Sequence, residues 1–158
     1  MLAAANPFDP RTVLLARHAQ HVVLIHFPIA LFTVGVAFDL AAEWSRRGRS
    51  GGQAFRMAEA AYYNLFVAAV FTVPVVITGI LAWQFALEGQ RLKGILLAHL
   101  VFGSVSAVLI LTSWSIHARA RRSGRPPARA RFLVEMAGLV LVSLTGHLGG
   151  LLSGVGGV

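Results

Sequence analysis

The chain has 158 residues, of which 56% are hydrophobic and 13% are charged. That charged fraction is well below the roughly 25% of an average soluble domain, so the composition argues against a water-soluble globule. The length suits one domain. Because the chain has no Cys, disulfides, thiolate metal sites and covalent haem attachment are excluded.

The first 21 residues are polar and are interrupted by the dipeptides Asn6-Pro7 and Asp9-Pro10. We expect residues 1–21 to form an external or interfacial segment, with a short interfacial helix from Pro10 to Gln20. The segment lacks the charged-then-apolar order of a signal peptide, so we expect it to be retained. Residues 22–158 are predicted to form one transmembrane domain.

Four apolar stretches follow, each close to the roughly 20 residues that a helix needs to cross a bilayer. They run from Val22 to Ala42, from Tyr62 to Leu87, from Ile95 to Ile116 and from Phe132 to Ser153. Backbone polar groups in lipid must be satisfied within the segment, and the alternation of a β-barrel is missing, so we expect helices. The predicted fold is all-α, a four-transmembrane-helix bundle in up-down-up-down order.

The polar connections between the stretches predict the orientation in the membrane. Basic residues outnumber acidic ones by 14 to 6. Ten of the basic residues lie at the first and third connections: Arg46, Arg47, Arg49, Arg56, Arg119, Arg121, Arg122, Arg125, Arg129 and Arg131. The other side holds Arg11, Arg17, Arg91 and Lys93. Because cytoplasmic loops carry the excess of Lys and Arg, we expect both termini on the periplasmic or external side of a bacterial inner membrane. Topology accounts for the positive charge, so the expected partner is the lipid bilayer and not a nucleic acid.

Three of the six histidines are expected in one layer of the bundle. His26 and His99 each lie about four residues into a span from the external side, which is about 6 Å of helix. His147 lies near the external end of the fourth span. His18 and His21 fall just outside this layer.

Small residues share the helix faces that carry these histidines. In the third span, residues three or four apart place one set on a single side: His99, Gly103, Ser106, Ile110, Ser113 and His117. In the first span the same spacing joins His26 to Ala30, Thr33 and Ala37. In the fourth, His147 lies beside Gly146, Gly150 and Gly154. We expect these faces to point into the bundle.

Two neutral imidazoles on facing helices can hold a haem b, with small residues where the macrocycle approaches the backbone. The pattern predicts at most one haem b near the external face, with His26 and His99 as iron ligands and His147 as an alternative ligand. Glycines would make room for the macrocycle: Gly103, Gly146 and Gly150.

Other interpretations of the three histidines stay open. A copper or zinc site built from His26, His99 and His147 is the competing chemistry. The imidazoles are alternatively plain interhelical hydrogen-bond donors. At the cytoplasmic end His117 is the one histidine available, so a second haem is not expected there, and a position at the interface beside Arg119 is the structural alternative for this residue.

The remaining charged residues are expected to be structural. Asp39 and Glu43 lie one turn apart near Arg46 and Arg47, where pairing at the helix end is the ordinary interpretation. Glu135 is expected at the membrane interface. Motifs of hydrolytic or phosphoryl chemistry are not evident.

The segments His21-Val-Val-Leu-Ile-His26-Phe-Pro-Ile-Ala-Leu and Thr145-Gly-His-Leu-Gly-Gly150 resemble a bacterial membrane family called domain of unknown function 2231. That family opens with His-Pro-Leu-x-Val-His-Phe-Pro-Ile-Ala and closes with Gly-(His/Tyr)-Leu-Gly-Gly. This chain departs from it at Val22, where the family has Pro, and at Ser153-Gly154, where the family often has His-Gly.

Relatives in that family are often joined to c-type cytochrome domains. The resemblance therefore implies a b-type cytochrome-like electron carrier. Its partners would be a c-type cytochrome or another redox subunit, or a quinol, and turnover of a substrate by this chain alone is not implied. An accessory transmembrane subunit of a larger respiratory or photosynthetic complex, without a cofactor, is the alternative function, and transport of a metal ion or small solute is a third.

Overall fold

The computed structural model describes residues 20–48 and 51–153. In these ranges four helices are long and apolar enough to cross a membrane and no strand occurs, which confirms the all-α prediction. The helices are α2 (His26–Arg47), which helical residues from Gln20 precede, α3 (Gly51–Leu81), α4 (Gly94–Ser123) and α5 (Arg131–Leu152). A short π-helical turn, η1 (Ala82–Ala86), continues α3. The predictions for residues 1–19, His18 among them, lie outside the described residues.

The helices extend beyond the apolar stretches that predict them. α3 begins at Gly51, well before Tyr62, and α4 continues to Ser123, where Gly124 ends it with a φ of 64°. Hydropathy marks the part of a helix that lies in hydrocarbon, whereas Arg, Glu, Gln and Ala prolong a helix into the headgroups and water because they are good helix formers. The polar connections are therefore shorter than the sequence predicts.

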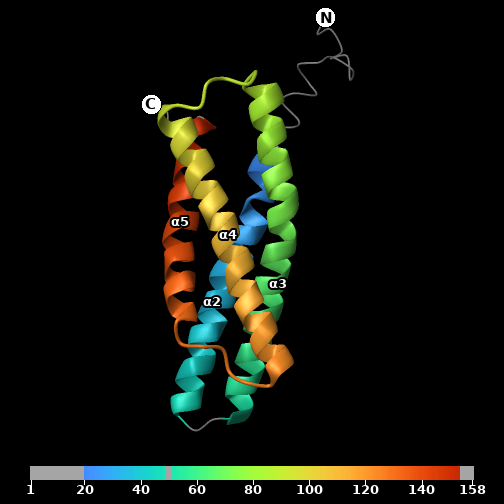
Figure 1. Ribbon diagram of the computed structural model, residues 1–158, viewed down its shortest axis with the longest axis vertical. Helices are drawn as coiled ribbons and strands as arrows, with labels where there is room; N and C mark the ends of the chain where they lie inside the picture. Colours follow the sequence, from blue (N-terminus) through green and yellow to red (C-terminus); the bar gives the residue numbers. More distant parts are fainter. Residues whose placement is uncertain (1–19, 49–50, 154–158) are drawn as a thin grey trace, which may run out of the picture.

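Successive helices run in opposite directions along the bundle (Figure 1). α2 lies mainly against α3, α4 lies mainly against α5, and α3 and α4 join the two pairs. One end of the bundle gathers the C-termini of α2 and α4 with the N-termini of α3 and α5. We call it the arginine end, because the described basic residues of the first and third connections lie there. Its location in the cytoplasm stays a prediction.

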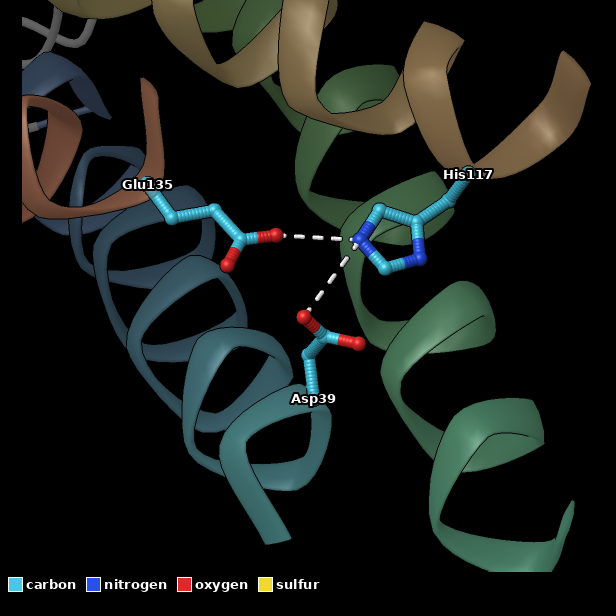
Figure 2. Close-up of side chains that lie close together, drawn as sticks. All are labelled: Asp39, His117 and Glu135. Carbon is cyan, nitrogen blue, oxygen red and sulfur yellow. Dashed lines mark hydrogen bonds and ion pairs between the residues drawn. The ribbon is translucent and has the colours of Figure 1, made fainter. Parts of the chain in front are cut away.

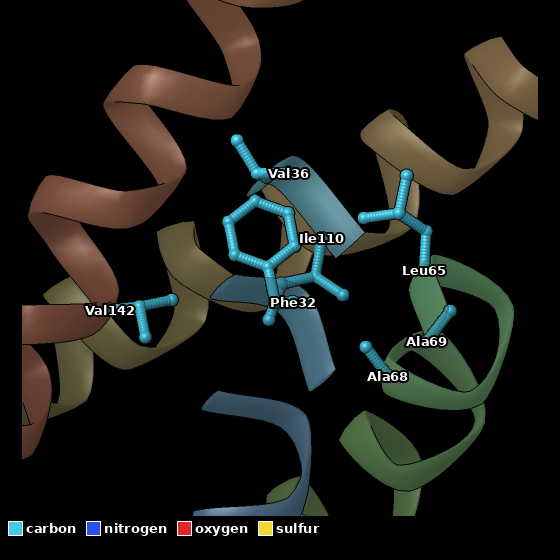
Figure 3. Packing of buried hydrophobic residues seen from close by; sticks show 7 residues of the cluster. All are labelled: Phe32, Val36, Leu65, Ala68, Ala69, Ile110 and Val142. Atoms are coloured by element: carbon cyan, nitrogen blue, oxygen red, sulfur yellow. The ribbon is translucent and has the colours of Figure 1, made fainter. Parts of the chain in front are cut away.

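The apolar core lies near the middle of each helix, and Figure 3 shows its side chains. It contains Phe32, Val36, Leu65, Ala68, Ala69, Ile110 and Val142. Phe32 packs so closely on α5 that a Cβ at Gly138 would lie 2.7 Å from its Cζ. Many large apolar side chains on the outer faces of all four helices are exposed. Such surfaces fit lipid, so the chain has the character of a multi-pass membrane protein.

Candidate functional site

Four ionisable side chains lie inside the bundle near the arginine end. Asp39 is 1% exposed, His117 6%, Arg131 1% and Glu135 0%. We call these four residues the buried charge cluster. Ionisable groups within membrane-spanning segments are costly and mark functional sites by default, so this cluster is the leading candidate site.

Helical spacing brings the four side chains together. Asp39 lies one turn after Val36 on the inward face of α2, and His117 lies one turn after the buried Ser113 on α4. Arg131 and Glu135 are four residues apart in the first turns of α5, so they share one face. Three helices therefore contribute to one site.

Arg131 binds Asp39 through a fork of two hydrogen bonds. Its Nε donates to Asp39 Oδ2 over 2.6 Å, and its Nη2 donates to Oδ1 over 3.3 Å. Its Nη1 donates to the Pro127 carbonyl oxygen over 3.0 Å. Charge-assisted, two-point contacts of this kind are the strongest hydrogen bonds that side chains form. The contact fixes the start of α5 against the end of α2.

His117 lies between the two carboxylates (Figure 2). Its Nε2 is 3.0 Å from Glu135 Oε1 and 4.0 Å from Asp39 Oδ2. Ser113 Oγ also donates to Glu135 Oε1, over 3.4 Å. The second oxygen, Glu135 Oε2, is buried and has no hydrogen-bond partner among the described residues.

The donor set of the cluster resembles a metal site in composition. One ligand atom each from Asp39, His117 and Glu135 lie within 4.8 Å of one another, and carboxylate with imidazole is a common ligand set for divalent cations. Arg131, however, already takes both oxygens of Asp39. A metal ion would therefore compete with a guanidinium.

The sequence interpretation of these residues is wrong at Asp39 and Glu135, whereas the inward face predicted for His117 is confirmed. Asp39 pairs with Arg131 across the bundle, Glu135 is buried, and His117 points inward. The interpretation of Glu43 is confirmed, because its carboxylate lies 3.2 Å from Arg46 and 3.6 Å from Arg47. The inward stripe of the third span already contained His117, and this was the signal that could have located the cluster.

At the opposite end of the bundle, His99 is half-buried between α4 and α5. Its Nδ1 lies 3.1 Å from the Thr145 carbonyl oxygen. A Cβ at Gly149 would lie 3.1 Å from His99 Cε1, so the ring packs on bare backbone. On the same face, a Cβ at Gly103 would lie 3.4 Å from the methyl carbon of Thr145. The predicted inward face of the third span is confirmed.

The other two predicted ligands face outward. His26 is exposed, and its Nδ1 lies 2.7 Å from the Val22 carbonyl oxygen of its own helix. His147 is exposed as well. The residues that share the face of His26, namely Ala30, Thr33 and Ala37, are also exposed. The expectation that this face points into the bundle is wrong, because Phe32, Val36 and Asp39 form the inward face of α2.

His21 lies where the sequence placed no ligand. Its Nδ1 is 3.2 Å from Thr78 Oγ1, and its ring packs on Gly79 of α3. Among the predicted glycines, a Cβ at Gly146 would contact Ile29, whereas one at Gly150 would meet nothing within 4 Å. In the described residues, the three-ligand group is Asp39, His117 and Glu135, and His26, His99 and His147 do not form one.

Comparison with known proteins gives a family and no characterised relative. No curated protein and no solved structure matches the chain. The family whose model matches residues 17–158 is described as predicted membrane protein (DUF2231). Since the match covers most of the chain, the chain belongs to the DUF2231 family of predicted membrane proteins.

Proposed function

We propose that the chain is a b-type cytochrome-like electron carrier of the bacterial inner membrane that binds one haem b, with His99 as an iron ligand. The observation that supports the proposal is the contact of His99 Nδ1 with the Thr145 carbonyl oxygen, at 3.1 Å. A carbonyl oxygen can only accept, so Nδ1 carries the proton and the lone pair of Nε2 is left for a metal. Metal-ligating histidines in proteins are commonly oriented in this way.

The second ligand in this proposal comes from α2. His26 has the same donor chemistry, because its Nδ1 lies 2.7 Å from the Val22 carbonyl oxygen. It lies on the exposed face of α2. Its imidazole therefore suits a haem iron chemically, and a haem bound there would be exposed on one side. His147 is the alternative ligand, and His21 is a further imidazole at the same end. When bound, a haem b supplies a one-electron couple, and the protein residues hold and orient it.

The exposed face of α2 suits exchange of electrons with a second molecule. A carrier must bring its redox group close to a donor and an acceptor, and an enclosed site would separate them. We propose a quinol or neighbouring subunit as donor and a c-type cytochrome as acceptor, on the periplasmic side that the distribution of arginines predicts.

A reduced-minus-oxidised absorption spectrum of the full chain, expressed with a haem supply and purified, tests the proposal. We expect a Soret band and a sharp α-band. H99A and H26A should lose both bands, whereas H117Q, at the arginine end, should keep them. Folded wild-type protein without either band after incubation with excess haem would overturn the proposal.

An accessory subunit without a cofactor is the second candidate. The exposed stripe of Ala30, Thr33 and Ala37 on α2 favours it, because small side chains let a helix of another protein approach closely in lipid. Purification from the native membrane within a large complex, with no pigment that depends on His99, would favour this function over electron transfer.

A further inference from the structure

The buried charge cluster does not balance its own charge. Arg131 compensates Asp39 through two hydrogen bonds of 2.6 and 3.3 Å. Glu135 then has one ionisable partner, His117, with 3.0 Å between Oε1 and Nε2, and Ser113 Oγ donates to the same oxygen over 3.4 Å. If the imidazole is neutral, the cluster has one net negative charge inside the bundle, which is costly where water is absent. One bound proton removes that charge.

Glu135 Oε2 independently indicates a missing positive partner. The side chain is fully buried, and this oxygen has no donor among the described residues. Figure 2 shows it turned away from the contact between Oε1 and His117. A buried carboxylate oxygen without a donor costs free energy, and the cost is smaller when the carboxyl group shares a proton with its neighbour.

An open cleft of about 410 Å³ reaches the cluster from the arginine end. The residues that line it are Glu43, Arg46, Arg47, Pro126, Pro127, Arg129 and Arg131. Arg131 belongs to both the cleft and the cluster, and its Nη2 lies 3.7 Å from Glu43 Oε2. The Arg131 side chain therefore lines the cleft and also contacts Asp39.

Toward the middle of the bundle, apolar side chains of the core follow the cluster along each of its three helices. Val36 lies one turn from Asp39 on α2, and Ile110 lies two turns from His117 on α4. Val142 lies two turns from Glu135 on α5, and Phe32 fills the space between the helices. A proton moves along hydrogen-bonding groups, and the side chains of this layer carry none.

We propose that Asp39, His117, Arg131 and Glu135 form a proton-binding site that takes up one proton from the arginine end and does not pass it through the bundle. The proton comes from a hydronium ion or a buffer acid in the cleft, and the conjugate base stays in water. It is held between His117 and Glu135, and no electron moves. This site is separate from the proposed haem ligands and does not depend on them.

A divalent cation is the competing occupant, and the charges argue against it. It would bring two positive charges to a site that lacks one. Positive charge is already in excess beside the cluster, because Glu43 is the partner of both Arg46 and Arg47 and also lies 3.7 Å from Arg131. A single proton matches the one charge that the cluster lacks, whereas a divalent cation would add to this excess.

NMR of the full chain in lipid nanodiscs, with ¹⁵N-labelled histidine, tests the site between pH 5 and 9. H117Q identifies the His117 signals by their loss. In the wild type we expect these signals to report the gain of one proton within this range. E135Q removes the carboxylate charge but keeps the shape, so the affinity of His117 for the proton should fall about tenfold or more, which is about one pH unit in the midpoint.

E88Q is the matched control, since Glu88 is exposed in the turn between η1 and α4, far along the chain from the cluster. It should leave the His117 titration unchanged. Ring signals of the wild type that stay constant from pH 5 to 9 would overturn the proposal without any variant. So would equimolar Zn²⁺ that shifts the His117 signals and abolishes their pH dependence, because the site would then belong to a metal.

Proteoliposomes that enclose a pH-sensitive dye test whether the site is open to one side only. Under an imposed pH gradient and a potassium diffusion potential, we expect the wild type to admit protons within twofold of the rate of protein-free vesicles. A rate ten times higher that falls to the protein-free value in E135Q would contradict the closed apolar layer and assign the cluster to a conducting path.

Discussion

The two ends of the bundle differ in the partners of their inward ionisable side chains. At the arginine end, Asp39, Arg131, His117 and Glu135 all turn inward and contact one another. At the opposite end, only His99 of the three predicted ligands is turned inward, and its partner is a backbone carbonyl. Charged groups in an apolar interior must find each other, whereas a neutral imidazole is satisfied by any carbonyl. The first end is thus organised by contacts within this chain, whereas at the second His26 and His147 are exposed.

The largest expected effect comes from removing the cation of the cluster. R131M leaves Asp39 and Glu135 buried without their guanidinium, and breaking a buried ion pair in this way costs about 3–5 kcal/mol. The free energy of unfolding is measured by unfolding the purified protein in mixed micelles with increasing SDS. R129M, in the exposed wall of the same cleft, is the control and should change it little.

The double variant D39L/R131M sharpens the same comparison. It removes both charges, so it should be more stable than R131M alone, because replacing a buried pair by apolar side chains is often neutral or stabilising. A value for R131M equal to that of R129M would show that the charges at the arginine end are not as dry as their burial indicates.

Packing in the apolar layer between the two ends gives the next effect. G138A places a methyl group 2.7 Å from Phe32 Cζ and 2.8 Å from Cε1. Phe32 lies in the centre of the core and has little room to move, so overpacking should cost about 1–3 kcal/mol in the same unfolding measurement. G150A, whose Cβ meets nothing within 4 Å, should be as stable as the wild type. Equal stabilities of the two variants would mean that α5 can shift away from α2.

At the end opposite the arginines, a smaller change tests the orientation of His99. G149A puts a methyl group 3.1 Å from His99 Cε1, which should rotate the ring and move Nε2. Haem is titrated into the apoprotein and its binding is followed at the Soret band. We expect the affinity for haem to fall about tenfold, which corresponds to about 1.4 kcal/mol. G51A, at the arginine end, is the control, because a Cβ there meets nothing within 4 Å. Unchanged affinity in G149A would argue that His99 is not a ligand.

Much of the fold could be predicted from the sequence, because length and hydropathy alone define spans in lipid. The inward face of α4 was also predictable, since His99, Gly103 and Ser113 recur at helical spacing among apolar residues. α2 misled the interpretation. Its face with His26, Ala30 and Thr33 is as rich in small residues as that of α4, yet the bulkier Phe32 and Val36 fill the core. Small residues allow two helices to approach closely. On α4 the face with small residues packs inside the bundle, whereas on α2 it lies on the outside.

The cluster was missed for a different reason. Asp39 and Arg131 are far apart in sequence, and their pairing depends on which helices are neighbours, which no local spacing reveals. Arg131 was counted with the third connection, and Glu135 was placed at the membrane interface. Only the packing of α5 against α2 and α4 shows that its first turn lies inside.

The smallest expected effect comes from an ion pair on the outside of the arginine end. Arg121 Nη1 lies 2.7 Å from Glu59 Oε1, with side chains 43% and 31% exposed, and its guanidinium lies 4.7 Å from the centre of the Tyr62 ring. Solvent and salt screen such a pair, and ordering two long side chains offsets the attraction. R121Q should therefore leave the SDS midpoint within experimental error, although its hydrogen bond to Glu59 is about as short as that of Arg131 to Asp39. A loss as large as that of R131M would show that distance, and not burial, decides the strength of ion pairs at this end.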